Sequence, residues 1–263
     1  MSRKLISISA IATLLGSTAI AEVPNVAVDM APLHSLVASV MSGVGVPSLI
    51  IPAGSSPHEH QLRPSEAKAM QEANVLFWMG EGLTPWMENA VETLATNASV
   101  TTFLEHDNTS LLEFREGALF EAHAHDDHDD DHDDEKHDDH DEHGHGAHDP
   151  HAWLSPNNAK VWLNIIAAQL SSYDPNNAGA YFANSSSAQS KIDATIAETN
   201  AILAPHKEKK FVVFHDAYQY FEQDFNFSAS GAISLGDASD PSPARIAKIQ
   251  KRIKDEGIDC VLA

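Results

Sequence analysis

The chain has 263 residues, of which 43% are hydrophobic, so it is long enough for two modest lobes or one large domain. It carries 16 Lys and Arg against 38 Asp and Glu, a formal net charge of −22 at pH 7. Nucleic acid and anionic membrane surfaces are therefore unfavourable partners, whereas cations are favourable ones.

The first 21 residues have the pattern of a secretory signal peptide. Arg3 and Lys4 precede an apolar run over residues 5–15, and residues 19–21 read Ala-Ile-Ala, a cleavage site of the A-x-A type. The apolar run is shorter than the roughly 20 residues that a membrane-spanning helix needs. We therefore predict that residues 1–21 are a signal peptide and that the mature protein is soluble outside the cytoplasm.

Short apolar runs alternate with longer helical patterns between residues 24 and 103. Pro64-Ser65 and Pro85 are suited to helix starts. The predicted strands are 25–28, 49–52, 75–79 and 99–103, and the predicted helices between them are 33–41, 65–74 and 84–94. This alternation predicts βαβ units and a parallel sheet.

Two longer helical patterns follow, and then the alternation resumes. The first helix is predicted over residues 156–170, with Ser155 as its cap. The second pattern runs over residues 175–203 and would be about 43 Å long, more than one lobe needs, so we predict that it joins two lobes. The elements predicted after it are strand 210–214, helix 217–224, strand 229–234, helix 243–256 and strand 260–263.

These patterns together predict an α/β protein of two lobes, each a parallel-type sheet flanked by helices. The expected parts are the signal peptide 1–21, an N-terminal lobe 22–172, a linking backbone helix 173–204 and a partial C-terminal lobe 205–263. Cys260 is the only cysteine, so the sequence as given contains no disulfide. Because the sequence stops in an apolar, strand-like run, we expect it to continue and the second lobe to be incomplete as given.

A segment rich in histidine and acidic residues, residues 121–148, is here called the His-rich tract. Its histidines follow no fixed spacing, whereas a defined zinc site needs three or four rigidly placed ligands. Ordering it would cost about 1–2 kcal/mol per residue with nothing buried in return. We predict a disordered loop that binds Zn²⁺, Cu²⁺ or Ni²⁺ weakly, with simple solvation as the alternative. The weak sites would use His123, His125, His128, His132, His137, His140, His143, His145 and His148.

Three other histidines occupy positions where an open α/β sheet holds ligands. His58 follows the second predicted strand, His215 directly follows the run FVVF and opens a helix, and His151 lies in DPHAWLSP before a capped helix. Asp149 and Asp216 beside them are either hydrogen-bond acceptors for the site or helix-end carboxylates. The three histidines form no local motif, so spacing leaves open whether they converge or lie separately on the surface.

Three segments, in order, resemble the metal-ligand segments of a known family. They are PHEHQLRPSEA from Pro57, DPHAWLSP from Asp149 and FVVFHDAYQYF from Phe211. They look like those of the cluster A-I (cluster 9) solute-binding proteins of ABC importers, and above all like the zinc-specific ZnuA type. The resemblance extends over essentially all of the predicted mature chain, including the His-rich tract and the long helix.

The resemblance implies that His58, His151 and His215 bind Zn²⁺ in a cleft between the lobes. In this family the first ligand is a histidine followed by an acidic residue and usually an aromatic one, and His60 occupies the aromatic position, so His58 is preferred. His60 and Glu59 are secondary candidates. The fourth ligand stays open among water, Glu59 and a carboxylate beyond this sequence. The resemblance also implies that a cysteine near the C-terminus pairs with the one at position 260, as in several relatives.

The function implied by the resemblance is high-affinity capture of Zn²⁺ in the periplasm and its delivery to an ABC-type importer. The expected partners are a membrane permease and its cytoplasmic ATPase, with the protein acting as a monomer and without nucleic acid. Three imidazoles favour zinc, because Mn²⁺ prefers carboxylates and water. A manganese-binding homologue is nevertheless an alternative.

Two further functional classes are considered. A zinc ion held by three histidines with an open position would suit a hydrolase, but no HExxH or GxSxG constellation accompanies these histidines. We therefore predict that the protein is not an enzyme. The other alternative is a periplasmic metal buffer in which the His-rich tract is the functional part.

Overall fold

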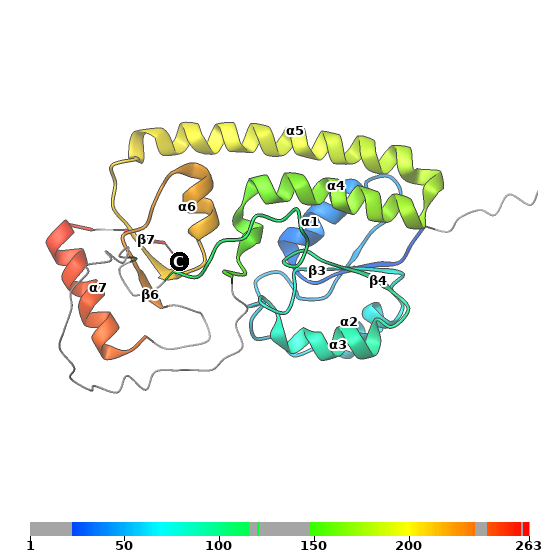
Figure 1. The fold of residues 1–263 in the computed structure, drawn as a ribbon, viewed down its shortest axis with the longest axis horizontal. Helices are drawn as coiled ribbons and strands as arrows, with labels where there is room; N and C mark the ends of the chain where they lie inside the picture. The colour runs from blue at the N-terminus through cyan, green and yellow to red at the C-terminus, as the bar shows by residue number, and fades with distance from the viewer. Residues whose placement is uncertain (1–22, 116–119, 121–147, 235–240, 259, 263) are drawn as a thin grey trace, which may run out of the picture.

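A computed structural model describes residues 23–115, 120, 148–234, 241–258 and 260–262. It contains two separate parallel sheets, one in each of two lobes, with helices packed around them (Figure 1). The predicted α/β architecture of two parallel sheets and a long helix is confirmed. Within the described residues, no helix is both long enough and apolar enough to cross a bilayer.

The first sheet has four parallel strands in the order β2-β1-β3-β4. Because its central strands are covered by helices on both faces, β1 and β3 are continuous apolar runs with every residue buried. The strands are β1 (Val26–Val28), β2 (Ser48–Leu49), β3 (Val75–Trp78) and β4 (Ser99–Thr102).

The helices of the first lobe cover the two faces of this sheet. On one face, Leu33 of α1 and Trp162 of α4 share a buried core with Phe77 of β3, whereas on the other face Met70 of α2 and Val91 of α3 pack with Leu76. The helices are α1 (Ala31–Val40), α2 (Pro64–Gln71), the 3₁₀ turn η1 (Pro85–Met87) with α3 (Glu88–Leu94), and α4 (Pro156–Tyr173), which follows the 3₁₀ turn η2 (Ala152–Leu154).

Most element boundaries in this lobe differ from the prediction by a few residues, and two of the differences change an element's extent or type. The strand expected over residues 49–52 is only Ser48–Leu49, because the chain turns at Pro52, whose carbonyl accepts from the Ser55 N–H at 3.1 Å. The helix expected from residue 84 starts with the 3₁₀ turn η1 instead. The predicted cap of α4 is confirmed: the Ser155 hydroxyl accepts a hydrogen bond from the Asn158 N–H at 3.1 Å.

The second lobe has three parallel strands in the order β6-β5-β7. Its core contains Phe211, Val213 and Ala232, against which Phe120 also packs. The elements are β5 (Val212–His215), α6 (Gln219–Phe225), β6 (Ala232–Ser234), α7 (Pro243–Glu256) and β7 (Val261–Leu262).

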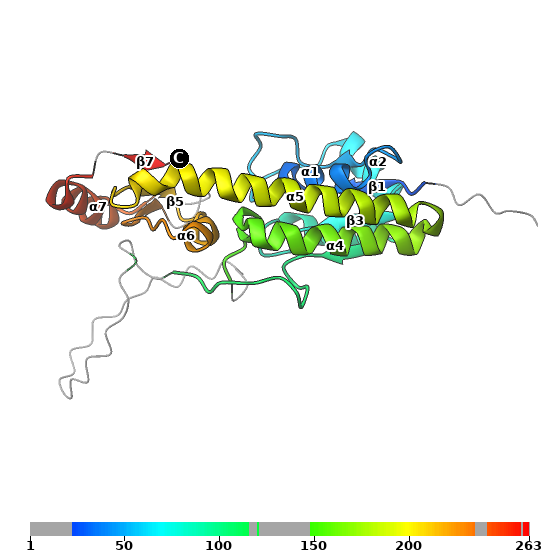
Figure 2. The ribbon, with the colours of Figure 1, turned by 90° about the horizontal axis from the view of Figure 1, so that it is seen from above.

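The long helix α5 (Ala178–Leu203) has 26 residues and runs along both lobes (Figures 1 and 2). It is preceded by the 3₁₀ turn η3 (Pro175–Asn177) and followed by the 3₁₀ turn η4 (Ala204–His206). At 1.5 Å per residue, α5 is about 39 Å long. Its buried residues are Tyr181, Ser185 and Ala188, all in the half that lies on α1 and α4.

Direct contacts also join the lobes beside the long helix. Tyr220 of α6 is 3% exposed and belongs to the core of the first lobe. The Ser155 hydroxyl at the start of α4 donates to Asp224 Oδ2 of α6 at 2.6 Å. Helix α6 therefore docks against the first lobe, which fixes the segment after β5 relative to the segment before α4.

Candidate metal centre

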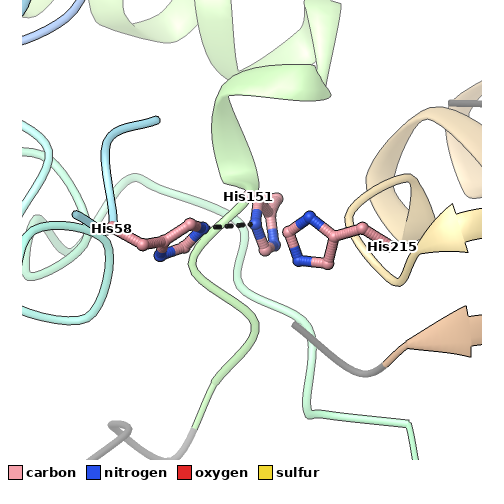
Figure 3. A group of neighbouring side chains, drawn as sticks. All are labelled: His58, His151 and His215. Carbon is pink, nitrogen blue, oxygen red and sulfur yellow. Dashed lines mark hydrogen bonds between the residues drawn. The ribbon is translucent and has the colours of Figure 1, made fainter. Parts of the chain in front are cut away.

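Three histidines that are far apart in the sequence point toward one another between the lobes (Figure 3). One ring nitrogen of each of His58, His151 and His215 lies within 4.8 Å of the others, and the Nε2 atoms of His58 and His151 are 3.2 Å apart. The His151 and His215 rings are 4.9 Å apart between centroids. Among the described residues, no other group of three or more His, Cys, Asp or Glu side chains converges closely enough to hold a metal ion.

His58 lies in the loop that connects β2 to α2. This loop is fixed next to His58, because the Trp86 indole N–H donates to the Pro57 carbonyl at 2.8 Å. It is also fixed after His58, where the His60 ring contacts Trp86 and its Nε2 lies 2.9 Å from Glu66 Oε2. The His58 ring is thus presented from a loop held at both sides, at the carboxyl edge of the first sheet.

His151 is 5% exposed and is oriented by the carboxylate of Asp149. Oδ1 of Asp149 lies 2.7 Å from His151 Nδ1 and also accepts from the His151 backbone N–H at 2.9 Å. With Nδ1 donating to Asp149, the lone pair of Nε2 faces His58, which is the arrangement of a carboxylate-oriented metal ligand. The structure therefore places Asp149 as a hydrogen-bond acceptor for His151.

His215 is the last residue of β5, where it is aligned with Ser234 of β6. The sequence prediction that His215 opens a helix is wrong: α6 starts only at Gln219, because His215 still takes part in the pairing of β5 with β6. The next residue, Asp216, donates its backbone N–H to the Ser234 carbonyl at 3.2 Å. His215 thus lies at the carboxyl edge of the second sheet, at the end of its central strand, whereas His58 lies in a loop beyond the carboxyl end of an edge strand of the first sheet.

The structure does not bring the two secondary candidates into this cluster. The His60 side chain is 7% exposed and pairs with Glu66, while Glu59 is exposed. Of the tract histidines, His148 is described: it is exposed and forms an antiparallel bridge with Glu113. The weak sites predicted at His123 to His145 lie outside the described residues.

Four residues that the sequence analysis did not select belong to the hydrogen-bond network around the segments that carry His151 and His215. Tyr220 accepts from the Leu112 N–H at 2.9 Å and donates its hydroxyl to the Asp149 carbonyl at 2.7 Å, and burial raises the pKa of this tyrosine to about 12. Arg115 pairs with Asp216 and Glu222. Burial raises the pKa of Asp216, although Arg115 opposes that rise. No local sequence pattern marks Arg115, Tyr220, Glu222 or Asp224 as neighbours of the site.

Three imidazole nitrogens suit a metal ion of intermediate softness, such as Zn²⁺. Zn–N bonds of about 2.0–2.1 Å in a tetrahedron place the nitrogens roughly 3.4 Å apart. The 3.2 Å between the Nε2 atoms of His58 and His151 is close to this spacing. A His215 nitrogen that lies at the upper bound of 4.8 Å from another ligand nitrogen would have to move by about 1.4 Å to reach it. Three imidazoles with one open position can therefore accept Zn²⁺ after a small contraction.

Two parallel-sheet lobes with metal-type donors converging from both define a two-lobed metal-binding protein. Comparison with known families is more specific, since the model of the family described as zinc-uptake complex component A, periplasmic (ZnuA), matches residues 26–263. The chain belongs to this family.

Individual relatives and solved structures agree with this assignment. The chain is 42% identical over 259 residues to the high-affinity zinc uptake system protein ZnuA of Paracoccus denitrificans, covering 95% of this chain and 79% of the relative. It is 41% identical over 267 residues to the protein of the same name from Brucella abortus, and this match covers 96% of this chain and 80% of the relative. A crystal structure of ZnuA has the same fold, with a TM-score of 0.69 at 21% identity, covering 89% and 79%.

The fold is shared with a protein that binds another metal. A manganese-bound periplasmic metal-binding protein from Candidatus Liberibacter asiaticus has a TM-score of 0.67 at 18% identity, covering 90% of this chain and 78% of that one. Similarity at this identity concerns the fold alone. The metal therefore has to be inferred from the donor atoms.

Proposed function

We propose that this protein captures Zn²⁺ in the periplasm through His58, His151 and His215 and supplies it to an ABC-type importer. The observation that supports this most directly is the approach of three imidazole nitrogens, from both lobes, to within 4.8 Å of one another. Imidazole suits Zn²⁺, whereas Mn²⁺ prefers carboxylate and water oxygens. The proposal is tested by titrating the full chain with zinc, with manganese as competitor; manganese binding as tightly as zinc would overturn it.

Members of this family are one component of a zinc uptake complex, so the other components of such an importer are the implied partners. We propose that these are a membrane permease and its cytoplasmic ATPase, and that the protein acts as a monomer that does not bind nucleic acid. Its net charge of −22 supports the absence of nucleic-acid binding. Membership in a family of uptake components also means that the protein is a solute-binding protein and not an enzyme.

Deletion of residues 123–147 separates the carrier function from the metal-buffer alternative. In a carrier, the deletion is expected to leave one tight zinc site and to remove only weak binding, because no ligand of the three-histidine cluster lies in the deleted segment. His148 is retained because it bridges to Glu113. Zinc stoichiometry by calorimetry before and after the deletion is the measurement. Loss of nearly all binding would instead identify the protein as a buffer that acts through the tract.

Zinc affinity is expected to decrease with decreasing pH. Zn²⁺ binds the neutral imidazole, and histidine side chains ordinarily titrate near pH 6.5, so protons compete with the metal below that pH. One such group alone gives a decrease of about 10-fold between roughly pH 7.5 and 5.5, and three give more. Competition with a chelator calibrated at each pH measures the effect. A constant affinity over this range would argue against imidazole ligands.

A further inference from the structure

Arg115 connects the first lobe to two carboxylates of the second lobe. Its Nη1 donates to Glu222 Oε2 at 2.7 Å, its Nη2 donates to Glu222 Oε1 at 3.0 Å and to Asp216 Oδ1, and its Nε donates to Asp216 Oδ2 at 3.3 Å. The three side chains are 16%, 5% and 7% exposed for Arg115, Glu222 and Asp216. All the guanidinium nitrogens thus take part in one nearly buried cluster.

The guanidinium is held in a fixed orientation by further contacts. Its central carbon lies 3.7 Å from the centroid of the Phe120 ring, and Phe120 packs on the core of the second lobe. Glu222 Oε2 also accepts from the Ala229 N–H at 3.1 Å. Such a planar, fork-shaped donor restrains both carboxylates at once, which the single ammonium group of lysine does not reproduce.

This cluster is adjacent to two of the candidate ligands. Asp216 directly follows His215, and its backbone N–H is bonded to Ser234. Three residues before Arg115, the Leu112 carbonyl accepts from the Asp149 N–H at 2.8 Å, and Asp149 orients His151. The segment 112–115 therefore contacts the residues that set the positions of both His151 and His215.

We propose that Arg115 is a positioning residue of the metal centre, which restrains His215 relative to His151 by clamping Asp216 and Glu222 to the segment 112–115. The inference rests on the proposed function of the three histidines. Arg115 is not one of the three candidate ligands. It acts on His215 through the adjacent Asp216, while Glu222 holds the same guanidinium in place.

The sign of the effect distinguishes positioning from simple electrostatics. A positive charge near a divalent cation repels it, so removal of that charge should strengthen metal binding if only the Coulomb interaction mattered. Loss of the clamp should instead weaken metal binding, because His215 would lose its fixed distance from His151. Arg115→Lys would keep the positive charge but lose the planar guanidinium, so this variant should also bind zinc more weakly.

The test compares Arg115→Lys and Arg115→Met with unaltered protein in the full chain, by zinc competition with a strong chelator. Both variants are expected to lose about 10-fold in zinc affinity, the lower end of the loss expected when a group that orients a metal ligand is removed, because Arg115 acts on His215 only through Asp216. Their Co²⁺-loaded forms are expected to show a weaker visible absorption than the unaltered protein, because the tetrahedral donor set is incomplete. Lys160→Ala is the matched control, since it also removes a cation from an ion pair, with Asp193, that is largely exposed.

Each outcome decides the question. Zinc affinity of Arg115→Lys equal to that of unaltered protein, or tighter binding by Arg115→Met, overturns the inference while the proposed function stands. Absence of tight zinc binding in the unaltered protein overturns the proposed function itself. If neither Arg115 variant folds by circular dichroism, Glu222→Gln decides: it keeps the Asp216 pair, and the inference then requires a smaller but measurable loss of affinity.

Discussion

Replacing His215 with alanine is expected to weaken zinc binding by about 100- to 1000-fold. Zinc binding by a four-ligand site contributes about 10–16 kcal/mol, or roughly 2.5–4 kcal/mol per ligand, and each 1.4 kcal/mol is a factor of ten. His215 is the only member of the cluster from the second lobe, so the variant would leave two imidazoles, His58 and His151, from the first lobe. Chelator competition measures the change directly.

His206→Ala serves as the control for this experiment. His206 is exposed and lies in the 3₁₀ turn η4, outside the three-histidine cluster, so its replacement removes an imidazole without touching the site. Thermal unfolding of both variants without metal shows whether either change disturbs folding. Equal zinc affinity of the two variants would exclude His215 as a ligand.

Replacing Asp149 with alanine is expected to lower zinc affinity by about 10- to 100-fold, as is usual for the carboxylate partner of a metal-binding histidine. The carboxylate bonds to His151 Nδ1 at 2.7 Å and so keeps the Nε2 lone pair directed at His58. Asp149→Asn is expected to lose less, because its amide oxygen can still accept a hydrogen bond from the His151 Nδ1–H. Zinc competition on the pair of variants separates orientation from charge.

The control for the Asp149 variants is Asp193→Ala. Asp193 carries the same charge, and its side chain is 57% exposed in a pair with Lys160. Surface pairs of this kind contribute about 0–1 kcal/mol. If Asp149→Ala and Asp193→Ala bound zinc equally well, the orienting role of Asp149 would be rejected.

Much of the fold could be predicted because its signals are local. The buried strands β1 and β3 are short apolar runs, and helix α7 occupies the predicted residues, with Ser242 as its cap and Gly257 in the left-handed conformation at its end. The three candidate histidines could be selected because each is close to the carboxyl edge of a strand or to a helix start.

The connections around the site could not be predicted, because they join residues that are distant in the sequence. Arg115 lies 101 and 107 residues from its partners Asp216 and Glu222, and Tyr220 lies 108 residues from Leu112. Such pairs depend on how the lobes dock, which no period or motif encodes. His60 and Glu66 are only six residues apart, but their pairing could also not be predicted, because it depends on the path of the loop before α2.

Residues 112–113, which precede the His-rich tract, pair with residues 148–149 at its other side. Glu113 and His148 are bridged as in an antiparallel ladder, and the Asp149 N–H bonds to the Leu112 carbonyl at 2.8 Å directly beside it. Each doubling of the chain between such fixed ends costs only about 0.6 kcal/mol of closure entropy. Insertions or losses in the intervening sequence can therefore accumulate with little penalty while His151 keeps its place, so natural variation could alter the tract independently of the metal centre.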